Sequence, residues 1–301
     1  MIKTENIVKR FGDFTALDHV SCTIPDGCIY GMVGSNGAGK STFLRLITGV
    51  YRLDGGKIEI DGQPNYENPS VKSQMMYVPD ELFFLNSSSM DRMAKLYQAV
   101  YPNFDHNRYL ELSKRFGLDT KKNLNTFSKG MKRQAAAILA LATRPKYMFF
   151  DETFDGLDPI MRNLVKSIIC EDVLDHKATA IITSHSLREL EDTCDQLALL
   201  HKGGLVFESD VENLKTALFK VQIAFNNEFN RNIFDGYELL KFSKHGSVAN
   251  AIIRGDRQEC VRRLSWLNPV LLEVLPLSLE EVFTYEMEAL GYVFDVKEEQ
   301  A

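Results

Sequence analysis

Gly34-Ser35-Asn36-Gly37-Ala38-Gly39-Lys40-Ser41 fits the phosphate-loop pattern G-x-x-x-x-G-K-[S/T] at every constrained position. The apolar run 28–33 before it predicts a buried strand, and residues 41–48 after it predict a helix that Gly49 closes. Strand, glycine loop and helix is the order that such a loop requires. The glycines let consecutive backbone N–H groups turn toward one anion, and the helix start adds the positive end of its dipole.

Two side chains at the end of this loop point to phosphate and metal chemistry. Lys40 is spaced to reach the β- and γ-phosphates of a nucleotide, and the Ser41 hydroxyl is spaced to ligate Mg²⁺. Mg²⁺ prefers oxygen ligands and commonly binds through substrate phosphates. The pattern alone is also compatible with a glycine-rich turn that binds nothing, so the rest of the chain has to support the nucleotide site.

Composition indicates a globular chain. Its 301 residues are 45% hydrophobic and 25% charged, which suits one large or two ordinary domains. With 35 basic and 41 acidic residues the net charge is −6, so there is no broad electrostatic footprint for nucleic acid. No stretch approaches the roughly 18 apolar residues of a membrane span, and the N-terminus has no apolar signal region, so we expect a cytosolic chain.

The cysteines are scattered, without a C-x-x-C pair and without a histidine cluster at metal-ligand spacing. Small, buried, reduced thiols are therefore expected. The five are Cys22, Cys28, Cys170, Cys194 and Cys260.

The first two thirds of the chain alternates strand and helix patterns. Residues 1–33 hold strand-like runs broken at two turns, which predicts antiparallel strands leading into the strand before the loop. Residues 86–145 carry three helical patterns, the last beginning near Ser128, and predict a helical insertion. Further strands are expected at 55–62, 75–78, 146–150 and 178–184, with a hairpin over 197–208.

Polar residues follow several of these strands directly. In open α/β sheets, ligands bind outside the carboxyl ends of the strands. A single sheet edge could therefore gather these residues, although a histidine in such a place has a structural role just as readily. The residues are Gly34, Asp80, Asp151, Glu152 and His185.

Residues 211–301 are organised differently, as a small α+β domain without a recognisable constellation of site residues. Its final helix is expected to begin with a capping box, because Ser278 and Glu281 have the required spacing. The last residues, 297–301, are expected to fray.

Two apolar features have open interpretations. Phe11, just before a turn, could stack on a nucleotide base, but an isolated phenylalanine is also a common core residue. The run 82–85, Leu-Phe-Phe-Leu, is either core or a contact with a partner.

Taken together, residues 1–210 resemble the nucleotide-binding subunit of an ATP-binding-cassette (ABC) transporter. Residues 34–42 match Walker A, 148–152 match Walker B with its adjoining glutamate, 156–159 match the D-loop, and His185 matches the switch histidine. The resemblance implies an α/β P-loop NTPase cassette, with a mixed-sheet core and a helical subdomain over about 86–145. The small C-terminal α+β domain over 211–301 follows it.

The resemblance also implies a role for each motif residue. Phe11 would stack on adenine, and Lys40, Glu152 and His185 would be catalytic, with Glu152 accepting a proton from the attacking water. Mg²⁺ would be held by Ser41, Asp80 and Asp151. ATP would be bound by Phe11, Gly34, Ser35, Asn36, Gly37, Ala38, Gly39, Lys40, Ser41 and Thr42, and in trans by Ser128, Gly130 and Asp158 of the opposite subunit.

The chain departs from the family pattern in three places. The signature motif reads Phe127-Ser128-Lys129-Gly130-Met131, which keeps the serine and the second glycine, so the helix start stays open toward an anion. Asp80 stands where the family usually has a glutamine, and its shorter carboxylate could still face Mg²⁺. Thr153 follows Walker B where a proline often stands.

As implied by the family, two chains would sandwich two ATP molecules head to tail, as a homodimer or with a paralogous cassette chain. The dimer would drive an integral membrane permease from the cytoplasmic face, and no nucleic acid is expected as a partner. The degenerate signature, the single cassette and residues 276–283 resemble ATPases of bacterial exporters of small molecules, lipids or antimicrobial peptides.

Other functions compete with this one. The runner-up is a soluble mechanical ABC ATPase acting on ribosomes or DNA, against which the single cassette and the lack of a sustained heptad run both count. A kinase would leave residues 128–131 and His185 unexplained, and Glu152 argues against a regulator without turnover.

Overall fold

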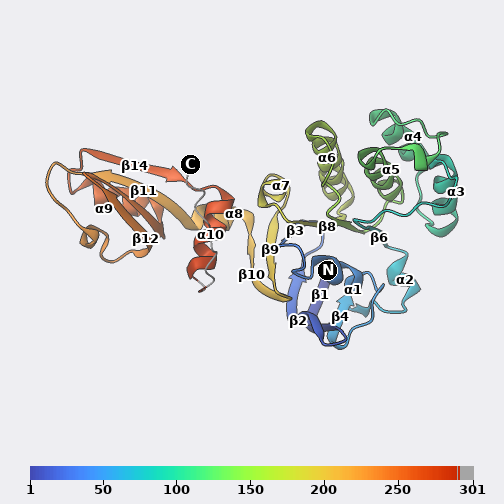
Figure 1. Cartoon of the computed structure of the whole chain (residues 1–301), viewed down its shortest axis with the longest axis horizontal. Coiled ribbons are helices and arrows are strands. Elements are labelled where there is room, and N and C mark those ends of the chain that lie inside the picture. The colour runs from blue at the N-terminus through green and yellow to red at the C-terminus, as the bar shows by residue number, and fades with distance from the viewer. Residues whose placement is uncertain (290, 292–301) are drawn as a thin grey trace. The chain divides into compact units, whose positions relative to one another are not determined.

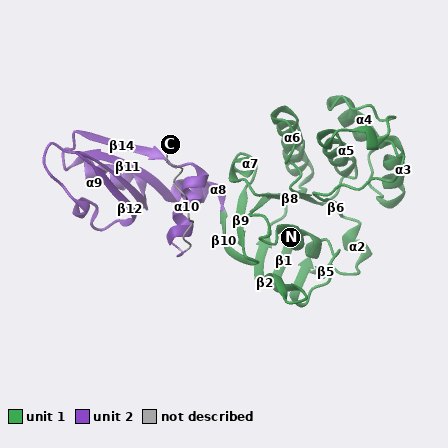
Figure 2. Ribbon diagram, viewed as in Figure 1, with its two compact units in different colours: residues 1–209 green, residues 210–301 purple. Residues whose placement is uncertain are grey.

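Two units, Met1–Ser209 and Asp210–Ala301, make up the chain in the computed structural model (Figure 2). The structure describes residues 1–289 and 291. The expected frayed tail, 297–301, lies outside the described residues.

The first unit is built on a six-stranded sheet with the order β10-β9-β3-β8-β7-β6. β3 pairs in parallel with β8 and β9, and β7 pairs in parallel with β8 and β6. Every residue of β3, β7 and β8 is buried, as is typical of parallel strands covered on both faces. The bounds are β3 Ile29–Val33, β6 Met75–Val78, β7 Tyr147–Asp151, β8 Thr179–Ser184, β9 Gln196–His201 and β10 Gly204–Asp210.

A second sheet, with the order β2-β1-β4-β5, lies against the first. Its strands are β1 Ile2–Phe11, β2 Phe14–Ile24, β4 Gly55–Ile60 and β5 Gln63–Pro64. The antiparallel pairing of β1 with β2 confirms the sequence-based prediction, but these strands form a sheet of their own and do not extend the sheet of β3. α1, Lys40–Ile47, packs between the two sheets, because its apolar side chains share one core with residues of both.

Helices cover the opposite side of the parallel strands. Figure 1 shows α5, α6 and α7 on one side of these strands and β1, β2 and β4 on the other. The expected insertion contains α3, α4 and α5, whose first turns are capped by Ser89, Asp105 and Ser128. The bounds are α2 Pro69–Lys72, α3 Met90–Val100, α4 His106–Arg115, the 3-10 turn η1 Leu124–Thr126, α5 Lys129–Ala142, α6 Pro159–His176 and α7 Leu187–Glu191.

The register of the parallel strands aligns their carboxyl ends. Val33 pairs with Ser184, Asp151 with Thr183, and Val78 with Phe150. The residues that follow these strands therefore lie along one edge of the sheet, where ligands bind in open α/β folds.

The second unit has a four-stranded antiparallel sheet with the order β12-β13-β11-β14. Its α9 packs on one face, where Cys260 and Leu264 join a core with Phe219, Val221 and Ile253. In α10, Ser278 and Glu281 exchange the two hydrogen bonds of a capping box, as the sequence predicted. The bounds are α8 Val211–Ala217, β11 Leu218–Ala224, the 3-10 turn η2 Arg231–Phe234, β12 Glu238–His245, β13 Val248–Arg254, α9 Arg257–Ser265, β14 Leu271–Pro276 and α10 Leu279–Ala289.

Within the described residues, no helix combines the length and the apolar character needed to cross a bilayer.

Candidate functional site

The loop between β3 and α1 takes its shape from glycine. Gly39 has φ 108° and ends the loop, and a Cβ there would come within 2.7 Å of the Ala16 carbonyl oxygen. A Cβ on Gly34 would come within 2.4 Å of the Leu200 carbonyl oxygen. Among the described residues, no side chain caps the start of α1. Its first N–H groups are therefore available to an anion.

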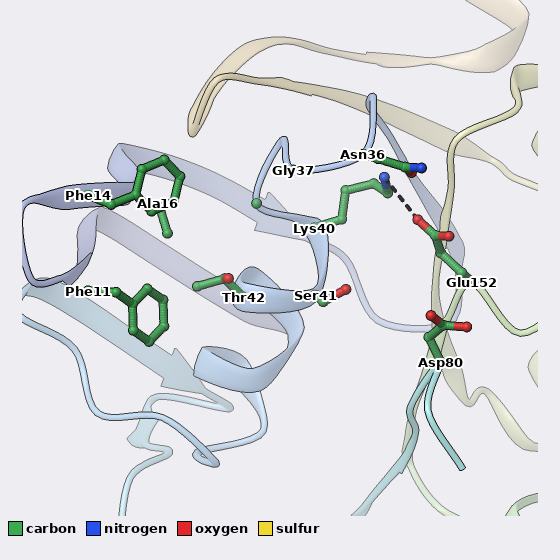
Figure 3. Close-up of a pocket in the computed structure, with 11 residues that line it drawn as sticks. Phe11, Phe14, Ala16, Asn36, Gly37, Lys40, Ser41, Thr42, Asp80 and Glu152 are labelled. Atoms are coloured by element: carbon green, nitrogen blue, oxygen red, sulfur yellow. Dashed lines mark ion pairs between the residues drawn. The ribbon is translucent and has the colours of Figure 1, made fainter.

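Lys40 is the buried cation of this loop, with 4% of its surface exposed. Its Nζ donates to the carbonyl oxygens of Gly34 and Ser35, at 2.7 and 3.2 Å. It also forms an ion pair with Glu152 Oε1 at 3.1 Å, drawn as the dashed line in Figure 3. A buried ammonium needs such partners, because an unpaired charge away from water is strongly disfavoured.

Asp151, at the end of β7, is completely buried and accepts three hydroxyl hydrogen bonds. Ser41 Oγ and Thr183 Oγ1 each donate to its Oδ1 at 2.9 Å, and Tyr77 OH donates to its Oδ2 at 2.9 Å. Burial, together with the Asp151 charge, raises the pKa of Tyr77, so that hydroxyl remains a donor. The structure thus joins the predicted Ser41 and Asp151 directly.

Glu152 follows Asp151 in a left-handed backbone conformation, with φ 46°. For a residue with a Cβ this conformation costs on the order of 1–2 kcal/mol, and such residues cluster at functional sites. Its N–H donates to Thr183 Oγ1 at 3.1 Å. The Glu152 carboxylate lies between Lys40 Nζ and His185, whose Nδ1 is 3.7 Å from Glu152 Oε2. The three residues predicted to be catalytic are therefore neighbours.

Lys40, Ser41 and Glu152 border one open pocket, whereas Asp151 and His185 are not among its lining residues. Figure 3 shows the loop along one wall of the pocket, with Asp80 and Glu152 at one end. Phe11 and Phe14 lie at the other end, paired across the β1–β2 turn. The Phe11 ring packs edge-on against Tyr51, at 5.5 Å between centroids, and is 44% exposed. The lining residues are Phe11, Phe14, Ala16, Asn36, Gly37, Gly39, Lys40, Ser41, Thr42, Asp80 and Glu152.

Asp80 lines the pocket as predicted, but its carboxylate is already paired. Arg133 Nη2, from α5, donates to Asp80 Oδ1 at 2.6 Å. The Asp80 side chain is still 46% exposed.

The side chains at this end of the pocket fit a magnesium ion. Ser41, Asp80, Asp151 and Glu152 offer oxygen atoms, which are the donors that Mg²⁺ prefers. Within the described residues, no cluster of three or more histidines, cysteines or carboxylates could hold a metal unaided.

The residues expected to act in trans are not among the described residues that line the pocket. Ser128 caps α5 by accepting from Met131 N–H at 3.2 Å, and a Cβ on Gly130 would come within 3.2 Å of the Gly156 carbonyl oxygen. Asp158 caps α6 by accepting from the N–H groups of Ile160 and Met161. All three residues therefore lie at the exposed start of a helix, Ser128 and Gly130 at that of α5 and Asp158 at that of α6.

Sequence reasoning missed several residues of the site. Phe14 had a usable signal, because Gly12 and Asp13 predict a tight hairpin that brings it opposite Phe11. Thr183 is the last but one residue of β8, two residues before His185, so strand-end reasoning could have included it. Tyr77 and Arg133 had no signal, because their partners are distant in the sequence.

Known proteins show which family the chain belongs to. Residues 17–155 match the ABC transporter family. A Bacillus subtilis (strain 168) protein, ABC transporter ATP-binding protein YtrB, is 31% identical over 283 residues, which cover 94% of this chain and 97% of the relative. The chain belongs to the ABC transporter family. It is an ATP-binding ATPase subunit of that family, as the sequence predicted.

Other relatives of this ABC subunit cover mainly the first unit. The lantibiotic transport ATP-binding protein SrtF of Streptococcus pyogenes is 30% identical over 230 residues, with 75% of this chain and 98% of the relative covered. A solved dimeric cassette in a post-hydrolysis state bound to ADP and Pi has a TM-score of 0.64 at 19% identity, covering 70% of this chain and 99% of that chain. This likeness confirms the α/β cassette fold.

Proposed function

We propose that the chain binds MgATP in the pocket of Figure 3 and uses its hydrolysis to drive export through a separate membrane protein. The observation that carries the proposal is the contact of Glu152 with both Lys40 and His185, beside the Ser41–Asp151 pair. Phosphoryl transfer to water needs charge stabilisation and an oriented nucleophile, and these residues supply both. Residues 1–210 would form the nucleotide-binding domain, and 211–301 an accessory domain.

The Lys40–Glu152 ion pair suggests how nucleotide binding prepares the site. The β- and γ-phosphates of ATP would compete with the Glu152 carboxylate for the Lys40 ammonium. Glu152 would then be free to accept a proton from the attacking water, while His185 contacts the γ-phosphate. Ser41, Asp151 and Asp80 would hold Mg²⁺ directly or through water, and the ion would neutralise phosphate charge.

A second cassette would complete the site. Ser128, Gly130 and Asp158 lie at exposed helix starts, which attract anions. They would contact the ATP held by the opposite subunit, either a second copy of this chain or a paralogous cassette. Two chains would then close head to tail around two ATP molecules.

The segment after Asp80 would meet the membrane partner. Phe83 is 81% exposed and Leu85 is 41% exposed, which favours the partner interpretation of this run over the core interpretation. The chain would then lie on the cytoplasmic face of the membrane. SrtF is named for lantibiotic transport, so a small molecule, lipid or antimicrobial peptide is the proposed class of cargo.

The Glu152→Gln variant tests the proposed chemistry. General-base catalysis is worth about 10²–10⁴-fold, so the steady-state ATPase rate should fall by that factor while ATP affinity changes little. Lys40→Ala should instead weaken ATP binding itself. Equal turnover in Glu152→Gln and the wild type would refute the role of Glu152, and unchanged affinity in Lys40→Ala would refute the loop assignment.

A further inference from the structure

Arg133 is a buried cation, 2% exposed, in the second turn of α5. A guanidinium removed from water is tolerated only when it is paired and hydrogen-bonded. Its Nη2 donates to Asp80 Oδ1 at 2.6 Å, its Nη1 donates to the Glu152 carbonyl oxygen at 3.1 Å, and Asp155 Oδ2 lies 3.8 Å from Nη1. One side chain therefore joins α5 to the loop after β6 and to the end of β7.

The bond to Glu152 fixes the backbone of the proposed general base. Glu152 is the residue with φ 46°, a conformation that persists only where its surroundings hold it. Its N–H is bound by Thr183 Oγ1, and its carbonyl oxygen is bound by Arg133. The direction of the Glu152 side chain thus depends on the position of α5.

The bond to Asp80 supplies the negative charge that Arg133 needs. Asp80 also lines the pocket of Figure 3, and its side chain is 46% exposed. A neutral glutamine at position 80 would leave the buried guanidinium without its closest anion. An aspartate at position 80 therefore supplies the negative charge that a buried arginine at position 133 needs.

We propose that Asp80 and Arg133 form one charge-paired unit that positions Glu152 according to the position of α5. The inference rests on the proposed function, because α5 begins with the residues that would meet the partner's ATP. Movement of α5 on closure would shift Arg133, and with it the Glu152 peptide. Arg133 is a positioning residue, since it acts through Glu152.

The test is a mutant cycle on the full-length chain, with MgATP hydrolysis as the readout. Asp80→Gln and Arg133→Gln should each lower kcat at least 10-fold and change the KM for ATP less than 3-fold. The double variant should lose no more activity than Arg133→Gln alone, because Asp80 acts on Glu152 through Arg133. Glu111→Gln and Lys114→Gln on α4 are matched surface controls and should leave kcat unchanged.

Further variants distinguish a failure of the Asp80–Arg133 pairing from a failure of the proposed function. Arg133→Lys keeps the charge but not the forked donors, so its kcat should fall between those of the wild type and Arg133→Gln. If Arg133→Gln does not fold, Arg133→Lys takes its place in the cycle with Asp80→Gln. Single variants with wild-type kcat, or losses that multiply in the double variant, would overturn the pairing. A wild-type chain without Glu152-dependent turnover would overturn the proposed function instead.

Discussion

Phe14 lies across the β1–β2 turn from Phe11, and both rings face the end of the pocket away from Glu152. Phe14 is 62% exposed, more than Phe11 at 44%, and Phe11 is already engaged by Tyr51 and by Lys9, whose Nζ is 5.4 Å from the Phe11 ring centroid. An exposed ring at the edge of a pocket is available to a planar base. Either aromatic is therefore placed to stack on adenine.

Replacing these rings should weaken nucleotide binding. Base stacking on an aromatic side chain is worth about 1–3 kcal/mol, so Phe11→Ala or Phe14→Ala should raise the Kd for ATP about 5- to 100-fold. Isothermal titration of each variant measures the effect, with Tyr66→Ala, outside the pocket, as the control. Wild-type affinity in both phenylalanine variants would show that neither ring contacts the base.

At the level of single residues, the sequence predicted the side chains that belong to a local motif. Lys40 and Ser41 belong to the loop, and Asp151, Glu152 and His185 each follow or end a buried strand. The partners of these groups could not be predicted, because they come together only through tertiary contacts. Arg133 reaches Asp80 across 53 residues of sequence, and nothing in its local pattern marks it as buried.

At the scale of elements, α5 links the signature residues to the catalytic end of the pocket. Its first turn carries Gly130, where a Cβ would approach the Gly156 carbonyl oxygen, and its second turn carries Arg133. The start of the helix is thus exposed while its next turn is held by buried contacts.

An aspartate in the first turn of α5 should block closure of two chains. Gly130→Asp would present a negative charge to the phosphates held by the opposite subunit, which repel it. We expect ATP binding to a single chain within about 3-fold of the wild type, and loss of the ATP-dependent dimer. Light scattering in the Glu152→Gln background measures the mass, with Gly130→Ala separating charge from size. A dimer in Gly130→Asp would contradict the in-trans role.

Helix starts were predictable because their signals are local. Ser128 caps α5, and Ser278 with Glu281 opens α10, as their spacing indicated. The sheet that a strand joins was harder to predict. β1 and β2 were expected to lead into β3, yet they form a separate sheet in which β1 pairs with β4. A short turn between two strands predicts that they pair antiparallel. Which sheet the two strands join depends on how they pack against α1, and a local pattern does not show this.

At the scale of the molecule, the core of the first unit contains buried thiols. Cys22 is 5% exposed and lies in the core that both sheets share with α1. Burial raises the pKa of Cys22 to about 12, from a usual value of 9.0. In the folded chain the thiol therefore stays neutral well into the alkaline range.

Alkaline pH should therefore destabilise the chain through Cys22. Only the unfolded chain ionises this thiol between about pH 9 and 12, so its contribution is fully present below pH 9 and is lost as the pH rises toward 12. The loss should be on the order of 1 kcal/mol by pH 10. Urea unfolding of the wild type and Cys22→Ala from pH 8 to 10 measures the difference in slope, and parallel curves would contradict it.

The two units differ in how widely they are shared among relatives. The match to YtrB covers 94% of the chain and so extends into the second unit, whereas the solved dimeric cassette covers 70%. The second unit has its own core and sheet. All residues that line the proposed ATP pocket lie in the first unit.

The proposed transport function requires that the chain bind a separate membrane protein, and one pull-down tests this. Tagged Glu152→Gln should hold ATP without hydrolysing it, and so should retain whatever protein the closed dimer drives. The measurement is a pull-down from native cells in mild detergent, with and without ATP, with the copurifying proteins identified by mass spectrometry. We expect a multi-span membrane protein to copurify. Ribosomal proteins or DNA, without a membrane protein, would contradict the proposed transport function.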